Sequence, residues 1–302
     1  MLKKAVVTGG AGFIGSNLVR ALLKEGVEVA VVDNFAAGRI DGRIVEGAIY
    51  HEIDILDLSK HLHIFNDVDV VFHLAALPRI QDTIDHPVET AETNVQGTLI
   101  VLEAARAGGA RKLIFSSSAA VYGDQDALPL SEDLPAQPKS PYGLHKYVGE
   151  QMCQLWSDLY GLPTVCLRYF NVYGPGSDPS GAYALVTGRF LDLRRQGKAL
   201  TVAGDGSNTR DYVHVSDVAR ANIAAAMNDH VGKGEVINIG SGQETSVAQL
   251  ADLIGGPIER TEPRLETPRS VADVSRAKEL LGWETVTLLE EGIAEMKRQS
   301  GI

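Results

Sequence analysis

The sequence predicts an α/β fold, in which a doubly wound parallel sheet carries helices on both faces and is joined to a smaller mixed α/β cap. Two patterns in the first 170 residues support this prediction. Short runs rich in Val and Ile alternate with segments of helical period, and the runs are apolar throughout instead of alternating with polar residues. Strands of that composition are buried on both faces, as they are in parallel sheets.

The elements follow in order along the chain. Strands are predicted in KKAVVTGG, VEVAVVDN, DVDVVFHLAA and ARKLIFSSS, and helices in FIGSNLVRALLKEG and PVETAETNVQGTLIVLEAARAGG. After LPTVCLRYFNVYGP the pattern loosens into Gly-, Pro- and Asp-rich loops, but SDVARANIAAAM and GEVINIG resemble a sheet-packed helix and a strand. We therefore assign 1–170, with 211–240 returning, to the sheet domain, and 171–210 and 241–302 to the cap.

The composition limits the cellular compartments and the classes of binding partner that we expect for this protein. No apolar run in the 302 residues approaches the length of a membrane span, and the first apolar stretch is interrupted too early for a signal peptide. The net charge of −11 disfavours binding to nucleic acid or to an acidic membrane. Cys153 and Cys166 lie in apolar segments, so we expect buried thiols in a reducing, cytoplasmic compartment. No spacing indicates a metal site, and His73 and His214 are expected to be satisfied structural histidines.

Four glycines stand between the first strand and the first helix. They are Gly9, Gly10, Gly12 and Gly15. Such a turn brings backbone N–H groups to a pyrophosphate at the helix N-terminus. The second strand ends at Asp33, whose carboxylate suits ribose hydroxyls and repels a 2′-phosphate, so NAD is favoured over NADP. Asp54 and Ile55, after the third strand, are candidates to flank the adenine.

The stretch SPYGLHKYVGEQ, residues 140–151, has the signals of a helix start. Ser140 offers a side-chain N-cap and Pro141 suits the first helical position. Tyr142 and Lys146 then share one face at i and i+4. A phenol titrates near pH ~10; Lys146, the positive helix end and NAD⁺ all favour its phenolate, which predicts a lowered pKa for Tyr142. Ser118 follows a strand of the same sheet and is predicted to relay a sugar hydroxyl proton to Tyr142.

These motifs together resemble the extended short-chain dehydrogenase/reductases, in particular the NAD-dependent epimerase/dehydratase family and its UDP-glucose 4-epimerase group. The matching stretches are TGGAGFIGSNL, DNF, FHLAA, SSSAAVYG, SPYGLHK, RYFNVYGP, GDGSNTRDYVHVSDVA, NIGSG and PRSVADVSRAKELLGW. The resemblance implies a Rossmann domain with tightly bound NAD and the catalytic residues Ser118, Tyr142 and Lys146. It implies a cofactor site made of Gly9, Gly12, Phe13, Ile14, Gly15, Asp33, Asn34, Asp54, Ile55, Leu74, Ala75, Ala76, Asn94, Tyr142 and Lys146.

The resemblance also narrows the reaction. The related 4,6-dehydratases carry an Asp-Glu pair immediately before VYG, where this chain has Ala119 and Ala120, and no Cys stands there to act in a 3,5-epimerase. Transient oxidation at C4 of a UDP-sugar, through a 4-keto intermediate, remains as the expected reaction. The alternatives are another nucleotide-sugar oxidoreductase, a C2 or uronate epimerase, and an NAD-binding regulatory or RNA-associated protein. The complete Ser–Tyr–Lys set disfavours the last of these.

Substrate contacts are implied by the same resemblance. Asn171 matches the family's sugar-diphosphate contact, Arg210 and Arg264 match its phosphate arginines, and Glu266 matches a ribose contact. Ser270, just before VAD, is small where a bulky residue excludes N-acetyl groups, so UDP-N-acetylhexosamines are expected to fit beside UDP-hexoses.

Two further expectations concern the nucleotide base of the substrate and the oligomeric state of the protein. Ala203 precedes GDG, where family members often carry an aromatic residue near the base, so nucleotides other than uridine stay open. The helices containing 88–107 and 142–160 resemble the family's dimer helices, which predicts a homodimer.

Overall fold

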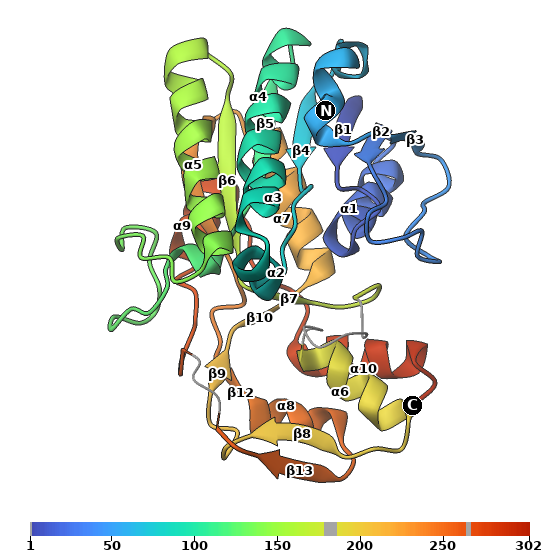
Figure 1. Ribbon diagram of the computed structural model, residues 1–302, viewed down its shortest axis with the longest axis vertical. Coiled ribbons are helices and arrows are strands. Elements are labelled where there is room, and N and C mark those ends of the chain that lie inside the picture. Colours follow the sequence, from blue (N-terminus) through green and yellow to red (C-terminus); the bar gives the residue numbers. More distant parts are fainter. Residues whose placement is uncertain (1, 178–185, 264–266) are drawn as a thin grey trace.

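The computed structural model describes residues 2–177, 186–263 and 267–302, and its larger lobe is built on a seven-stranded sheet (Figure 1). The strand order is β3-β2-β1-β4-β5-β6-β11, and every pairing within this sheet is parallel. The strands are β1 (Lys4–Thr8), β2 (Glu28–Asp33), β3 (Ile49–Glu52), β4 (Val70–His73), β5 (Lys112–Ser118), β6 (Thr164–Tyr169) and β11 (Lys233–Ile239). The predicted doubly wound α/β fold is therefore confirmed.

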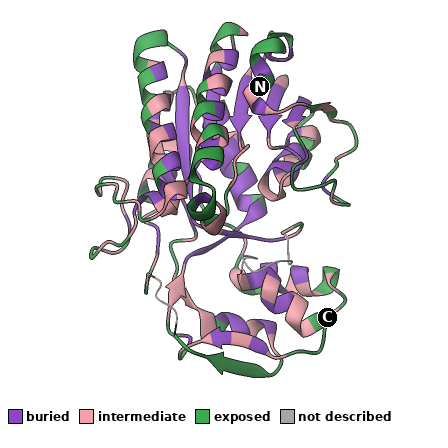
Figure 2. Ribbon diagram, in the orientation of Figure 1, coloured by how far each residue is buried: buried purple, intermediate pink, exposed green. Residues whose placement is uncertain are grey.

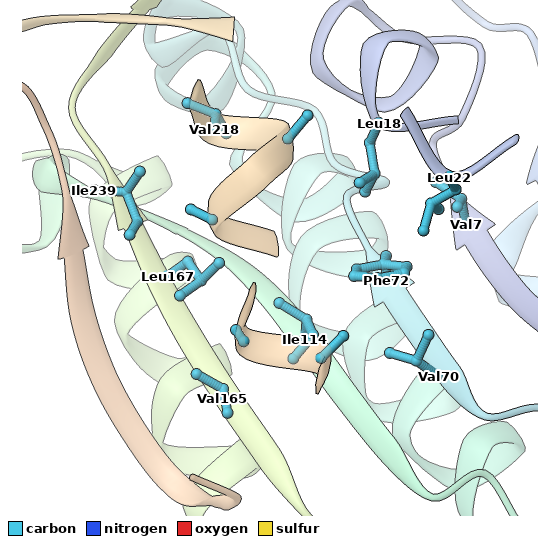
Figure 3. Close-up of a cluster of buried hydrophobic side chains, with 14 of the residues drawn as sticks. Val7, Leu18, Leu22, Val70, Phe72, Ile114, Val165, Leu167, Val218 and Ile239 are labelled. Atoms are coloured by element: carbon cyan, nitrogen blue, oxygen red, sulfur yellow. The ribbon is translucent and has the colours of Figure 1, made fainter. Parts of the chain in front are cut away.

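One face of the sheet is covered by α1 (Phe13–Lys24) and α7 (Val215–Met227). Successive side chains of a strand point to opposite faces, and Val7 of β1 and Ile114 of β5 lie on this side, in the core drawn in Figure 3. Leu18 of α1 packs into the same core and is fully buried.

The opposite face is covered by α4 (Gly97–Ala107) and α5 (Pro141–Tyr160). Val6 and Leu113, the neighbours of Val7 and Ile114, belong to this second core. The outer surfaces of the two helices are exposed (Figure 2). Burial on both faces is the physical reason why these strands read as uniformly apolar.

Short helical segments complete the larger lobe. They are η1 (Ile55–Lys60), η2 (Leu62–Phe65), α2 (Ile80–Asp85), α3 (Pro87–Ala91), the π-helical turn η3 (Glu92–Gln96) and η4 (Ala119–Val121). The strand order reverses at β1, since the chain proceeds to β2 and β3 on one side and to β4, β5 and β6 on the other. Ligands of such sheets bind at the carboxyl ends of the strands beside this reversal.

The smaller lobe is a mixed α/β unit with its own core (Figure 1). Its elements are the parallel pair β8 (Leu200–Ala203) and β13 (Ile258–Thr261), the antiparallel pair β9 (Thr209–Arg210) and β12 (Thr245–Ser246), and the helices α6 (Val186–Arg195), α8 (Val247–Ile254) and α10 (Leu289–Gln299). The parallel pair β7 (Asn171–Tyr173) and β10 (Tyr212–His214) lies between the two lobes (Figure 1).

The helix α9 (Ser275–Leu281) lies elsewhere than the sequence analysis places it. We assign 241–302 to the cap, but Ala277 and Trp283 are buried in the core that α1 and α7 share with the sheet. The Trp283 indole donates a hydrogen bond to the carbonyl of Asp217 in α7, at 3.0 Å. Helical periodicity reveals an apolar face but not the partner of that face, so the sequence pattern could not place α9.

His73 is a satisfied structural residue, as predicted. Its two ring nitrogens lie 2.8 Å from the Thr8 hydroxyl and 3.0 Å from the Thr98 hydroxyl. Burial, with Lys146 as a smaller cause, lowers its pKa to about 3, so the ring is neutral at physiological pH. Cys153 and Cys166 are buried, as expected, and both thiols are free.

His214 meets its prediction only in part. Its Nδ1 lies 2.7 Å from the Ser216 hydroxyl and caps α7. Its Nε2 is buried with no hydrogen-bond partner among the described residues, and lies 3.5 Å from the Glu295 carboxylate. Within the described ranges, no helix is long and apolar enough to cross a membrane, and no group of His, Cys, Asp and Glu side chains is arranged to hold a metal ion.

Candidate active site

The turn between β1 and α1 is shaped for close approach of a ligand. A Cβ on Gly15 would lie 2.1 Å from the Gly9 carbonyl oxygen, and a Cβ on Gly9 would lie 2.6 Å from the Ala75 nitrogen. Gly9 also has a positive φ of 73°. Among the described side chains none caps the start of α1, whose first turn carries no acidic residue. The positive helix end is thus open to an anion, and the pyrophosphate of a dinucleotide fits this cradle.

Asp33 is held beside that turn at the end of β2. Its carboxylate accepts hydrogen bonds from the Ala11 nitrogen at 2.9 Å and from the Phe35 nitrogen at 2.8 Å. Each carboxylate oxygen retains acceptor capacity for a ribose hydroxyl. Asn34 donates to the carboxylate of Asp54 at 2.7 Å, so the segments after β2 and β3 are joined at the same edge of the sheet.

The remaining predicted cofactor residues line the carboxyl ends of the neighbouring strands. Leu74, Ala75 and Ala76 follow β4, and the Leu74 nitrogen donates to the Thr8 carbonyl at 3.1 Å. Asn94, in the π-turn η3, holds this loop by exchanging two hydrogen bonds with the backbone of Leu77, at 2.7 and 3.0 Å. Phe13 and Ile14 open α1 and are half-buried, whereas Ile55 is buried.

The helix α5 begins as the sequence predicts. The Ser140 hydroxyl accepts a hydrogen bond from the Gly143 nitrogen at 3.1 Å, and Pro141 occupies the first turn. The Tyr142 nitrogen, free at this helix end, donates to the Thr83 hydroxyl at 3.2 Å. This hydrogen bond ties the backbone of Tyr142, the candidate base on α5, to α2.

Ser118, Tyr142 and Lys146 are brought together at this edge. The Ser118 side chain lies near enough to Tyr142 to exert a lowering effect on its pKa. The Lys146 ammonium donates to the carbonyl of Ser116 at 2.7 Å and lies 5.8 Å from the centroid of the Tyr142 ring. The arrangement offers a hydroxyl pair for proton relay with a fixed cation behind it, which is suited to acid–base work at a sugar hydroxyl.

In the protein alone, the pKa of Tyr142 is shifted in the opposite direction to the one expected beside NAD⁺. Burial raises the pKa of Tyr142 to about 12, and Ser118 lowers it by less. The Tyr142 side chain keeps some exposed surface, but the surroundings of its hydroxyl are buried. Desolvation of a phenolate therefore outweighs the lowering effect of Ser118 on the Tyr142 pKa.

Lys146 is itself perturbed. Burial lowers its pKa to about 8, against a smaller upward contribution from Cys153 and Glu150. Glu150, which is 1% exposed, accepts hydrogen bonds from Arg168 at 2.8 and 2.8 Å and from the Ser117 hydroxyl at 2.5 Å. Glu150 was not among the predicted site residues, although its position four residues after Lys146 places it on the same helical face.

The substrate side contains a second missed residue, Asp211. Its buried carboxylate accepts hydrogen bonds from the backbone of Ser241, Gly242 and Ala272 at 2.6, 2.9 and 3.0 Å, and one from the Ser241 hydroxyl at 2.7 Å. It therefore joins the loops that carry NIGSG and VAD. A carboxylate directly before the apolar pair Tyr212 and Val213 was the available signal.

Two predicted substrate contacts flank Asp211. The Asn171 amide donates to the Asp211 carbonyl at 3.2 Å. The Arg210 guanidinium donates to the carbonyls of Thr209 and Thr267, both at 2.8 Å. The two side chains are thus positioned by β7, β9 and the start of the segment that resumes at residue 267.

The remaining predicted contacts lie on or beside that segment. Ser270 is half-buried next to Val271 and Ala272, which are buried. Arg264 and Glu266 lie outside the described residues. Ala203 ends β8 and is half-buried.

Comparison with known proteins gives consistent matches over nearly the whole chain. The sequence model of the NAD dependent epimerase/dehydratase family matches residues 5–240. The chain is 40% identical over 306 residues to the UDP-glucose 4-epimerase of Mycolicibacterium smegmatis, covering 97% of this chain and 96% of that one. The structure is similar to the UDP-glucose 4-epimerase of Thermotoga maritima with UDP-glucose, with a TM-score of 0.92, 38% identity and 99% of each chain covered. The structure is also similar to the UDP-N-acetylglucosamine 4-epimerase of Methanobrevibacter ruminantium M1 in complex with UDP-N-acetylmuramic acid. The TM-score is again 0.92, with 32% identity and 99% of each chain covered.

Proposed function

The chain belongs to the NAD-dependent epimerase/dehydratase family, and from this membership and the geometry of its site we propose that it is a 4-epimerase of UDP-sugars. The observation that carries the proposal is that Ser118, Tyr142 and Lys146 meet at one edge of the sheet, where the Ser116 carbonyl fixes the Lys146 ammonium beside the Tyr142 ring. The glycine turn and Asp33 would hold NAD, which would supply a reversible hydride acceptor for C4 of the sugar.

The protein's own residues move the proton. Ser118 orients the C4 hydroxyl and passes its proton to Tyr142, while C4 loses a hydride and becomes a ketone. Lys146 supports the phenolate of Tyr142 by its charge. In the return direction Tyr142 gives the proton back through Ser118 to the C4 oxygen, so the protein ends each cycle in its starting state.

The nucleotide diphosphate is the anchor in this proposal. The sugar has to present both of its faces to the same hydride position, so its pocket must accept two orientations and binding energy must come from the rest of the ligand. We assign the diphosphate to Asn171 and Arg210, whose positions beside Asp211 support that role. Arg264 and Glu266 are assigned by resemblance.

The sugar pocket is proposed to admit N-acetylhexosamines as well as hexoses, because Ser270 is a small residue. The similarity to a UDP-N-acetylglucosamine 4-epimerase supports this extension. Dehydration is not expected, since Ala119 and Ala120 after Ser118 offer no acid or base for elimination.

We propose a cytoplasmic homodimer. Large apolar side chains are exposed along α2 to α5, helices that contact one another on the same side of the sheet (Figure 1). They are Ile80, Ile84, Val88, Leu99, Leu144, Leu155, Leu159 and Tyr160. Two buried free thiols suit a reducing compartment.

The proposal is tested by an NMR time course of the purified protein with UDP-glucose, and separately with UDP-N-acetylglucosamine, without added NAD. Appearance of the galacto epimer is the expected result. Tyr142→Phe serves as the control for a contaminating enzyme. If neither substrate gives an epimer even after NAD is added, the assignment to UDP-hexoses and UDP-N-acetylhexosamines is wrong, and UDP-uronates, other nucleotides or a different sugar carbon take their place.

A further inference from the structure

The segment after β7, residues 174–177, lies against the start of α1; we call it the strap. In Figure 1 it leaves β7 towards α1. The Asn17 amide donates to the Pro175 carbonyl at 3.0 Å and to the Phe13 carbonyl at 2.9 Å. A Cβ on Gly176 would lie 3.8 Å from Asn17 Nδ2 and 3.9 Å from a ring carbon of Phe13. The strap therefore borders the helix end at which a dinucleotide pyrophosphate is expected.

Arg43 fastens the strap from the other side. It belongs to the loop between β2 and β3, which is otherwise largely exposed, yet only 6% of Arg43 is accessible. Its Nε and Nη2 donate to the Gly176 carbonyl at 3.0 and 2.7 Å. A guanidinium is seldom buried without a reason of this kind, since its desolvation is costly.

The backbone that carries Arg43 is itself anchored. The Tyr50 hydroxyl of β3 accepts a hydrogen bond from the Val45 nitrogen at 2.9 Å and lies 3.4 Å from the Arg43 carbonyl. Arg20 of α1 donates to the Gly42 carbonyl. Contacts with β3 and α1 therefore hold the backbone of Arg43 beside the strap. The hydrogen bonds from Arg43 to Gly176 join residues that are 133 positions apart in the sequence.

We propose that Arg43 is a cofactor-retaining residue, which holds the strap across the start of α1 and so slows the dissociation of NAD. This inference rests on the proposed function, because a 4-epimerase needs the same NAD to remain in place from oxidation to reduction. Arg43 acts through Gly176 and takes no part in proton transfer. Its removal is expected to change the residence time of NAD.

The experiment measures NAD release directly. Wild-type protein and Arg43→Met are loaded with radiolabelled NAD, separated from free nucleotide and chased with excess unlabelled NAD. Loss of two hydrogen bonds from a charged donor is expected to accelerate release about 10–100-fold. Arg39→Met is the matched control: Arg39 lies in the same loop, its side chain is 57% exposed, and it pairs with Glu52. We expect its release rate to stay within about twofold of the wild type.

Release from Arg43→Met at the wild-type rate would overturn the proposal while leaving the proposed function intact. Wild-type protein that neither retains nor binds NAD would overturn both. Should Arg43→Met fail to fold, Arg43→Lys decides the question. A lysine keeps the charge but cannot donate from two nitrogens to one carbonyl in the same way, so an intermediate acceleration supports the proposal and an unchanged rate contradicts it.

Discussion

The Lys146 ammonium donates a hydrogen bond to the carbonyl of Ser116, 2.7 Å away and two residues before Ser118. This contact joins the helix that carries the candidate base to the strand that carries the candidate relay. Lys146 thus has a positional role in addition to its charge, because it sets the approach of α5 to the end of β5.

Tyr142→Phe removes the proton acceptor and keeps the ring that packs at the start of α5. We expect kcat to fall about 10²–10⁴-fold, the usual contribution of a positioned acid–base group. Initial rates of epimerisation give kcat, and the NAD content of the purified variant shows whether the site is intact. A variant with unchanged NAD content and a kcat within a few-fold of the wild type would remove Tyr142 from the mechanism.

The buried lysine should make stability depend on pH in a defined window. Burial lowers the pKa of Lys146 from 10.5 to about 8. Between these values the unfolded chain binds more protons at Lys146 than the folded protein, so the contribution of this group to stability rises with pH. Relative to Lys146→Met, the wild-type free energy of unfolding should rise by about 3 kcal/mol from pH 8 to 10.5.

Urea denaturation of both proteins at stepped pH measures that difference. Lys60→Met is the control, because Lys60 is an exposed lysine whose side chain is 72% accessible. Its difference from the wild type should stay flat over the same range. A flat difference for Lys146→Met as well would show that the ammonium is not desolvated in the folded protein.

The buried pair of Glu150 and Arg168 should respond in opposite ways to single and double replacement. Their side chains are 1% and 5% exposed, so Glu150→Ala leaves an uncompensated buried cation and is expected to cost about 3–5 kcal/mol. The double variant Glu150→Met, Arg168→Met removes both charges and should recover most of that loss. Urea denaturation measures both. A double variant as unstable as the single one contradicts this account.

Ser270 is expected to control the choice of sugar. Ser270→Tyr should lower kcat/KM for UDP-N-acetylglucosamine about 10–200-fold, because a bulkier side chain occupies the space of the N-acetyl group. UDP-glucose should be affected much less, and Ser270→Ala should leave both substrates unchanged. An equal loss for both substrates would mean that position 270 shapes the whole pocket and not the N-acetyl site.

The proposed dimer is tested on α5. Leu155 and Leu159 are 48% and 65% exposed, and replacing both by Glu should convert a dimer to a monomer in light scattering after size exclusion. Val286→Glu is the control, since Val286 is 67% exposed on the chain between α9 and α10. If the mass of the double variant equals that of the wild type, this face is not the interface.

Much of the fold and the family could be predicted from local pattern. Apolar runs predict strands buried on both faces, and the glycine turn between a strand and a helix predicts the dinucleotide cradle. The buried strands and the shape of the turn are confirmed, because both depend chiefly on residues near in sequence. That the turn holds a dinucleotide stays a prediction. The roles of the individual site residues stay predictions, although the structure brings Ser118, Tyr142 and Lys146 together.

The sequence by itself determined the element order, the start of α5 at Ser140 and Pro141, and the shared face of Tyr142 and Lys146, since spacing and capping act within one turn of helix. Only the tertiary structure decided the rest: that α9 packs on the sheet lobe, that Glu150 pairs with Arg168, and that Arg43 reaches Gly176. It also decided that burial raises the pKa of Tyr142. Desolvation and long-range contacts depend on which distant segments surround a group, and no local pattern contains that information.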